Sequence, residues 1–222
     1  DDNFASVVKA VELGRTFMHN IMMFLEFQLP INIALLVLSV IYPMVATGAL
    51  LASVQILIIN IIMDSLNSLS FGGESPKEEY MSERPIKKGS GLFIRGAKKR
   101  IAISTAAFIA LYGIITFSPV ANIFASDIEA VTARFALLCF MAVFNGFNIR
   151  TEHMNLFNGI GKNKLFSYIA VGIFAMTVIL CDFAGALIKA TALNPHQWQV
   201  VIALAFMVIP IDLIRKIVDN RN

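Results

Sequence analysis

Long apolar stretches, separated by shorter polar segments, run through almost the whole chain. A helix that crosses the hydrocarbon core of a bilayer needs about 20 mainly apolar residues, because each residue advances the helix by about 1.5 Å. These stretches are apolar on every face, unlike the amphipathic helices of a soluble core. The pattern predicts an all-α membrane protein with six transmembrane helices. We expect a domain over residues 21–222, with spans at about 24–46, 49–71, 101–121, 132–149, 166–188 and 197–217.

Composition supports the membrane assignment. Hydrophobic residues make up 57% of the chain and charged residues 15%, whereas soluble domains have about 45–50% and about 25%. The basic residues form no stripe with interleaved aromatic residues, so we expect the lipid bilayer, and no nucleic acid, as a partner. The sequence contains no Ser-His-Asp arrangement, P-loop or Gly-rich phosphate motif, and predicts neither a catalytic residue nor a cofactor site within these residues.

Lysine and arginine are concentrated in alternate connections between the expected spans. They occur before the first span, throughout residues 72–100, after the fourth span and in the C-terminal tail. The other connections carry only Arg134 and Lys189. Because basic loops remain in the cytoplasm, this bias predicts a multi-pass protein with both termini and the 72–100 loop on the cytoplasmic side.

Residues 2–20 carry a weaker helical pattern. Phe4, Val7, Val8 and Val11 recur at helical spacing, and no proline separates them from the first span. We therefore expect one long helix whose residues 1–20 include a cytoplasmic stalk; the alternative is a disordered tail. The loop at 72–100 is rich in Gly, Pro and mixed charges, which predicts a docking surface or a tether without a core of its own.

Asp64 is the clearest polar residue inside an expected span. A carboxylate at the bilayer centre costs about 2.5–3.5 kcal/mol even on the mildest scale, so an acidic residue there indicates function. Asn60 lies one helical turn earlier and shares a face with Asp64. This pair predicts an ion site. For Gln55, Asn67 and Ser68 we favour hydrogen bonds between helices instead.

Asn32 lies in the first span, two residues after Pro30. Proline lacks an N–H, so the carbonyl of Glu26 loses its helical partner and a kink is expected beside the asparagine. Asn32, Asn60 and Asp64 together offer about four oxygens, fewer than the six to eight that Ca²⁺ prefers. Further ligands would come from backbone carbonyls, water or a segment outside this chain.

Three other acidic residues lie near the ends of the expected spans. We expect Glu26 to be solvated, and Asp182 and Asp212 to have structural or interfacial roles, because water lowers the cost of charge there.

Several segments resemble the P-type cation pumps. The opening DDNFASVVKAVELGR is similar to the end of their phosphorylation domain, where it leads into the stalk of the fifth membrane helix. The segments EFQLPIN, VQILIINIIMDSL, SPKEEYMSERPIKKGSGLF, FNGFNIR, NLFNGIGKNKLF and HQW follow the order of the calcium pumps. The resemblance implies family helices five to ten, with residues 1–20 as the end of the phosphorylation domain and the stalk.

The resemblance also implies a metal site. The family's ion ligands match Asn32, Asn60 and Asp64. Leu35 and Met63 stand where sarcoplasmic-type calcium pumps carry a carboxylate and a threonine. A third carboxylate of that branch is absent, its place falling at about Ala142. These departures resemble the plasma-membrane-type branch and imply Ca²⁺ as the transported ion, one ion per cycle and the plasma membrane as location, with Mn²⁺ left open.

The sequence contains nothing similar to the family's phosphorylated DKTGT aspartate, its nucleotide domain or its fourth-helix glutamate. The resemblance implies that ATP and Mg²⁺ act in N-terminal pump domains outside these residues, and that the chain is a fragment of an ATP-hydrolysing translocase. The preferred function is therefore the ion-binding membrane part of a Ca²⁺ export pump. The alternatives are a stand-alone six-span secondary cation transporter or channel, and a structural membrane subunit.

Overall fold

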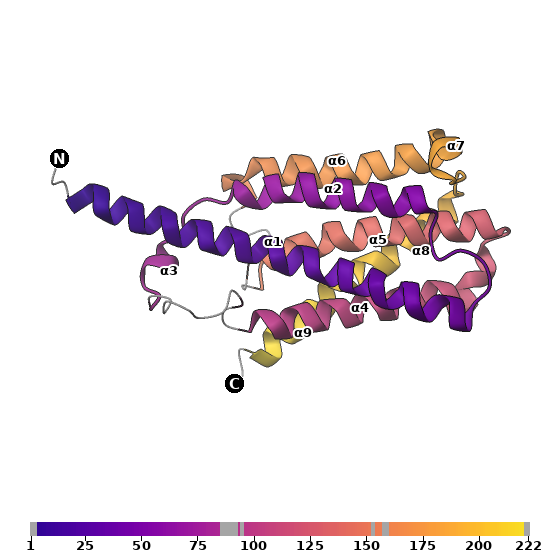
Figure 1. Ribbon diagram of the computed structural model, residues 1–222, viewed down its shortest axis with the longest axis horizontal. Coiled ribbons are helices and arrows are strands. Elements are labelled where there is room, and N and C mark those ends of the chain that lie inside the picture. Colours follow the sequence, from indigo (N-terminus) through magenta and orange to yellow (C-terminus); the bar gives the residue numbers. More distant parts are fainter. Residues whose placement is uncertain (1–3, 85–92, 94–95, 152–153, 157–159, 220–222) are drawn as a thin grey trace.

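The computed structural model describes residues 4–84, 93, 96–151, 154–156 and 160–219, without the side chains of residues 62–64, 68 and 162. Within this part of the chain the regular structure is entirely helical (Figure 1). The elements are α1 (Phe4–Val45), α2 (Ser53–Gly72), α3 (Glu78–Met81), α4 (Ala97–Phe117), α5 (Asp127–Arg150), α6 (Lys164–Phe183), α7 (Gly185–Ile188), α8 (Pro195–Phe206) and α9 (Val208–Asp219), with 3₁₀ turns at Pro119–Ile123 and Ile160–Lys162.

Helix α1 is much longer than a membrane span. Its 42 residues reach about 63 Å at 1.5 Å per residue, whereas the hydrocarbon core of a bilayer is about 30 Å thick. The N-terminal part of α1 projects beyond the other helices (Figure 1), and its side chains from residue 4 to residue 15 are mostly exposed. The predicted continuous helix is confirmed, and it passes through Pro30 as a single element. We call the end of the bundle from which α1 projects the stalk end.

The region expected as a sixth span, 197–217, consists of two helices. Helices α8 and α9 have 12 residues each and meet at Met207. Pro210 explains the break, because it has no N–H to offer the carbonyl of Phe206 and its ring collides with the turn before it. Counting apolar residues does not detect this missing donor.

Other spans differ from their expected bounds for local reasons. Helix α4 is shifted towards the N-terminus and ends before Pro119, which starts a 3₁₀ turn. Helix α5 begins earlier, at Asp127, because the hydroxyl of Ser126 accepts a hydrogen bond from the N–H of Glu129 (3.3 Å) and caps it. Helix α6 ends at Phe183, and the chain turns back at Gly185, where a Cβ would lie only 2.4 Å from the carbonyl oxygen of Ala190.

Helix α5 forms the centre of the bundle. Every side chain from Thr132 to Val143 is buried, and α5 packs against α1, α4, α6, α8 and α9. The aromatic ring of Phe140 stacks on Phe174 of α6 with centroids 4.2 Å apart and contacts Trp198 of α8 at 5.9 Å. Helices α2 and α6 form a second layer, packed side by side (Figure 1).

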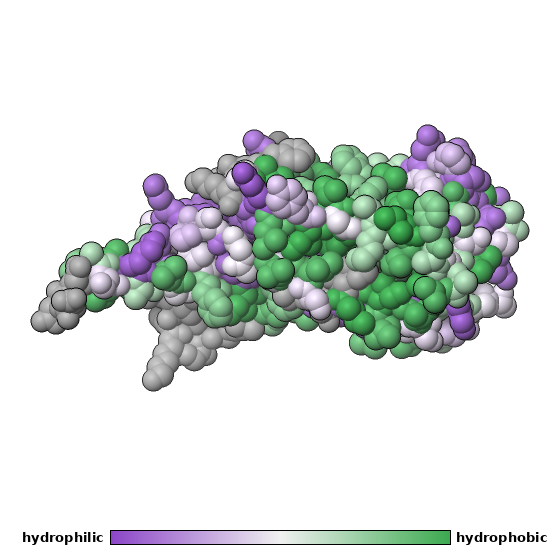
Figure 2. All heavy atoms as spheres, turned by 90° about the horizontal axis from the view of Figure 1, so that it is seen from above, coloured by the Kyte–Doolittle hydropathy of each residue, from purple (hydrophilic) through white to green (hydrophobic). Residues whose placement is uncertain are grey.

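The surface and the helix lengths agree with an integral, multi-pass membrane protein. Among the described residues, α1, α2, α4, α5 and α6 are long and apolar enough to cross a bilayer. Figure 2 shows a mainly hydrophobic band across the bundle, with hydrophilic residues gathered at its two ends. The beginning of α1 and the end of α9 lie towards the same end of the molecule (Figure 1), as an even number of crossings requires.

Candidate functional site

The predicted cation ligands lie on α1 and α2, which pack against each other. Asn32 is exposed on α1, whereas the neighbouring Ile31 and Ala34 are buried. Asn60 is half-buried on α2. Residue 64 belongs to the same helix, so Asn60 and Asp64 occupy consecutive turns on one face, but the side chain of Asp64 lies outside the described part of the chain.

Asn32 and Asn60 differ from Gln55 in their contacts with the described residues. Within the described residues, the side chains of Asn32 and Asn60 make no hydrogen bond. Gln55 behaves differently: its Oε1 accepts the N–H of Ala52 (3.1 Å), and its Nε2 donates to the carbonyl of Lys189 (3.3 Å). The structural role expected for Gln55 is thereby confirmed. The described residues contain no group of three or more His, Cys, Asp or Glu that could hold a metal ion.

The described part of the 72–100 loop binds the stalk. Nη1 of Arg15 donates to the carbonyl oxygens of Tyr80 (2.6 Å), Met81 (3.2 Å) and Glu83 (2.7 Å). The ring of His19 stacks on Tyr80 with centroids 3.8 Å apart, and Nε2 of His19 lies 3.2 Å from Oε2 of Glu83. Burial, followed by the charges of nearby glutamates, raises the pKa of the Tyr80 phenol. The loop is thus a docking surface for α1 over residues 80–83.

A buried ion pair connects the stalk ends of α2, α5 and α6. The carboxylate of Glu74, just after α2, pairs with Nε of Arg150, the last residue of α5. Asn163, the N-cap of α6, donates from Nδ2 to the same Glu74 oxygen (2.9 Å) and to the carbonyl of Ser70 (2.9 Å). We call Glu74, Arg150 and Asn163 the junction.

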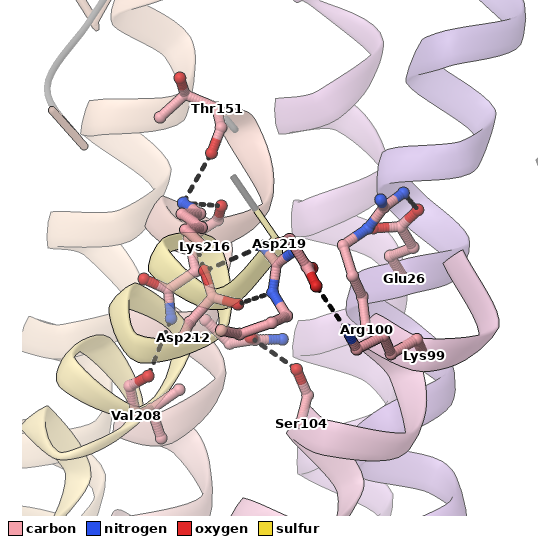
Figure 3. A network of polar contacts seen from close by, with 12 residues as sticks. Glu26, Lys99, Arg100, Ser104, Thr151, Val208, Asp212, Lys216 and Asp219 are labelled. Carbon is pink, nitrogen blue, oxygen red and sulfur yellow. Dashed lines mark hydrogen bonds and ion pairs between the residues drawn. The ribbon is translucent and has the colours of Figure 1, made fainter. Parts of the chain in front are cut away.

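Glu26 is not solvated, contrary to expectation. Its side chain is 6% exposed and forms a two-pronged ion pair with Arg100 at the start of α4 (Figure 3). The partner is 74 positions away and lies in a loop-like basic run, so the sequence alone gives no sign of it. The pair fixes α1 to α4 at the stalk end.

Helix α9 is attached to the bundle by charged residues. Asp212 pairs with Arg215 (2.6 Å) and Lys216 (3.2 Å), and Asp219 pairs with Lys99 and Arg215 (Figure 3). Nζ of Lys216, which is fully buried, also donates to the carbonyls of Asn148 (3.0 Å) and Thr151 (2.7 Å) at the end of α5. We call Lys99, Asp212, Arg215, Lys216 and Asp219 the α9 network. The structural role expected for Asp212 is confirmed.

The opposite end of the bundle contains a buried cation. The guanidinium of Arg134, 6% exposed, bonds to the hydroxyl of Tyr42 and to the carbonyls of Ala49 (3.3 Å) and Ala130 (3.1 Å). It borders a hollow of about 950 Å³ between the end of α1 and the start of α5. Tyr112 donates to the carbonyl of Leu50 (2.8 Å). These contacts hold the connection between α1 and α2.

Comparison with known proteins identifies the family. The family model described as "Cation transporting ATPase, C-terminus" matches residues 48–218. The chain belongs to the cation-transporting ATPase family. It is 34% identical over 224 residues to calcium-transporting ATPase 12, plasma membrane-type, of Arabidopsis thaliana, covering 98% of this chain and 21% of that protein. It is 32% identical over 218 residues to plasma membrane calcium-transporting ATPase mca-1 of Caenorhabditis elegans, covering 93% of this chain and 17% of that protein.

These matches confirm the resemblance seen in the sequence motifs. The chain corresponds to the C-terminal membrane half of plasma-membrane-type calcium-transporting ATPases. It spans about a fifth of the length of the relatives it matches.

The sequence did not predict the polar contacts that join the helices at the stalk end. Arg15 and Arg150 belong to the basic residues whose distribution predicts topology, and Glu74 lies in the charged 72–100 loop. A charged residue at the edge of an apolar span does indicate a helix end. Its partner is set by tertiary packing, which a single sequence does not contain.

Proposed function

We propose that this chain is the ion-binding transmembrane part of an ATP-driven Ca²⁺ export pump. One observation carries the proposal: α2, an apolar helix in the bundle, bears Asn60 and Asp64 on consecutive turns and packs against α1, which bears Asn32. The amides of Asn32 and Asn60 are not engaged within the described residues. Amide and carboxylate oxygens are the ligands that Ca²⁺ prefers.

The site needs further ligands from outside the three residues. Asn32, Asn60 and Asp64 provide about four oxygens out of the six to eight of a Ca²⁺ site. The exposed amide of Asn32 lies on an apolar face of α1, next to Ile33 and Leu36. An amide facing hydrocarbon without a partner is costly. Additional helices of the same pump, packed on this face, would cover Asn32 and complete the coordination.

In the proposed mechanism, the energy comes from domains that lie outside these residues. ATP and Mg²⁺ bind there, and an aspartate is phosphorylated. The resulting movement reaches the membrane through the stalk of α1 and opens the site alternately to the two sides. The stalk end faces the cytoplasm, in keeping with its Lys and Arg residues, and Ca²⁺ leaves across the plasma membrane.

The decisive test uses Asp64→Asn in the full-length pump that carries these residues. We expect Ca²⁺-dependent phosphorylation by ATP to be lost while expression and membrane insertion remain normal. Asp127→Asn, which removes an exposed carboxylate at the start of α5, is the matched control and should retain it. Calcium-dependent phosphorylation that survives Asp64→Asn would remove Asp64 from the site.

Two further measurements define the transported ion and the coupling. Competition between Ca²⁺ and Mn²⁺ in the phosphorylation assay gives the relative affinity of the two ions. Ca²⁺ flux into vesicles without ATP would instead support a secondary transporter or channel.

A further inference from the structure

Arg134, in α5 at the end of the bundle opposite the stalk end, is a buried cation without a carboxylate partner in the part of the chain that the structure describes. Three other buried cations each pair with a carboxylate, and these are Arg150, Arg215 and Lys216. A buried charge that lacks an opposite charge is unfavourable. The counter-charge of Arg134 must therefore come from outside the described residues.

The protein groups that contact Arg134 leave some of its donors unused. A guanidinium has five N–H groups, and the bonds to Tyr42, Ala49 and Ala130 occupy three of them. The acceptors are a hydroxyl and two backbone carbonyls, and the ring of Tyr42, 5.2 Å from Cζ of Arg134, is also uncharged. One N–H on each of Nη1 and Nη2 has no acceptor among the residues described. Guanidinium groups bind the oxygens of phosphates and carboxylates through these nitrogens.

The hollow beside Arg134 is large and mainly apolar. Its volume is about 950 Å³, at the upper end of the roughly 300–1,000 Å³ of ligand pockets. Val45, Phe117 and Phe124 belong to its lining. Val45 and Phe117 are exposed, so apolar surface leads from the hollow to the outside of the bundle. Asp127 also lines the hollow, but it is exposed, and water and salt screen its charge.

The hollow lies at the level of lipid headgroups. Its residues come from the end of α1, the end of α4 and the start of α5. Figure 2 shows hydrophilic residues gathered at the ends of the bundle, next to the hydrophobic band. The headgroups of a bilayer lie at this boundary, and basic pockets between membrane helices bind them. A free inorganic anion, in contrast, would gain nothing from the apolar part of the lining.

We propose that this hollow is a binding site for a phospholipid of the non-cytoplasmic leaflet. Arg134 binds the phosphate group, which supplies the missing negative charge, and the acyl chains leave the hollow along the apolar surface beside Phe117. The site is separate from the cation site on α1 and α2. It does not depend on which ion the pump transports.

Photo-cross-linking in the full-length pump that carries these residues tests the proposal. The pump is reconstituted in phosphatidylcholine vesicles that contain a trace of phosphatidylcholine with a photoactivatable group on one acyl chain, close to the glycerol. The matched probe is a diacylglycerol with the same chains, which lacks the phosphate. Mass spectrometry locates the cross-links, and yields are expressed relative to those on the exposed face of α6. At residues 41–49 and 117–131 we expect the phosphatidylcholine probe to give about tenfold more cross-links than diacylglycerol, because charged hydrogen bonds bind its phosphate.

Two variants separate the charge from the space. Arg134→Met should lower the yield of the phosphatidylcholine probe about tenfold, to that of diacylglycerol. Ala130→Leu places a larger side chain on the wall of the hollow and keeps the carbonyl that Arg134 binds. It should give the same loss, and it decides the question if Arg134→Met does not fold. Lys189→Met, which removes an exposed basic residue outside the hollow, should leave the yield unchanged.

Several results would overturn the proposal. These are equal yields for the two probes, absence of phosphatidylcholine cross-links at the hollow, and a yield that survives both Arg134→Met and Ala130→Leu. Excess inorganic phosphate should have no effect, and a loss of cross-linking on its addition would assign the site to a free anion instead. Because the measurement does not use transport, a pump that moves no Ca²⁺ would overturn the proposed function and leave the lipid site intact.

Discussion

Nη1 of Arg15, on the stalk, lies 2.6 Å from the carbonyl oxygen of Tyr80, 65 positions further along the chain. The same nitrogen also reaches the carbonyls of Met81 and Glu83. One guanidinium nitrogen thus binds three backbone oxygens. Two belong to Tyr80 and Met81 in α3, and the third belongs to Glu83, just after the C-cap of that helix. This contact attaches the 80–83 segment to α1.

Replacing Arg15 should release this segment without unfolding the bundle. Hydrogen bonds to a charged group are worth about 1.5–3 kcal/mol, so Arg15→Met should speed hydrogen exchange of the amides at 78–82 about thirtyfold. Lys9→Met is the control, because Lys9 pairs with Glu12 on the exposed stalk and such pairs contribute little. Equal exchange rates in the two variants would show that Arg15 does not hold the segment.

The ion pair between Glu26 and Arg100 should be costly to break from one side. Removing one partner of a fully buried pair typically costs about 3–5 kcal/mol, and the cost here should be at the low end, because the side chain of Arg100 that remains is 23% exposed. Glu26→Gln should therefore lower the thermal unfolding temperature in detergent micelles markedly. The double variant Glu26→Leu with Arg100→Met should recover most of that loss, since no unpaired charge remains.

The exposed Lys98→Met, two positions from Arg100, controls for loss of a basic residue. Lys98→Met should unfold at the same temperature as the protein without substitutions. A double variant as unstable as Glu26→Gln would mean that the charges act independently.

The contact between Asp219 and Lys99 should depend on pH. The hydrogen bond from Lys99, with the charges of Lys99 and Arg215, lowers the pKa of Asp219 below its ordinary value. A lowered folded-state pKa means that the carboxylate stabilises the fold fully above the unfolded value, about 3.9, and that this contribution is lost as pH falls through the folded value. The attachment of the end of α9 should therefore persist at neutral pH and weaken only in acid.

Titration of ¹³C-labelled aspartate by NMR in micelles measures this directly. In Lys99→Ala the pKa of Asp219 should rise towards its ordinary value. An unchanged titration would assign the shift to Arg215 instead.

The sequence predicted what depends on local properties. Helix positions follow from runs of apolar residues, and the common face of Asn60 and Asp64 follows from helical spacing. The break before Val208 was missed because the apolar residues around Pro210 outweigh it in a count over the whole stretch, although its missing N–H ends the helix.

The partners of the ion pairs could not be predicted from local sequence properties. Glu26 was expected to meet water because it lies near a span end, yet Arg100 covers it. The two residues come together only because α1 packs on α4. For the candidate site, the ligand types and their spacing on α2 could be predicted from the sequence, whereas the exposed position of Asn32 depends on how α1 is rotated in the bundle.

The α9 network offers a comparison between two substitutions of different cost. Asp212→Asn leaves Arg215 and Lys216, both buried, without their shared carboxylate, and should destabilise the fold by about 3–5 kcal/mol. Lys216→Met keeps the apolar stem and leaves Asp212 paired with Arg215, so the loss should be limited to the hydrogen bonds of the ammonium group, about 2–3 kcal/mol. The thermal unfolding temperature of Asp212→Asn should be lower than that of Lys216→Met. Both should be lower than that of the exposed control Lys164→Met. The reverse order would mean that the ammonium bonds from Lys216 to Asn148 and Thr151 at the end of α5 stabilise the fold more than the carboxylate that Arg215 and Lys216 share within α9.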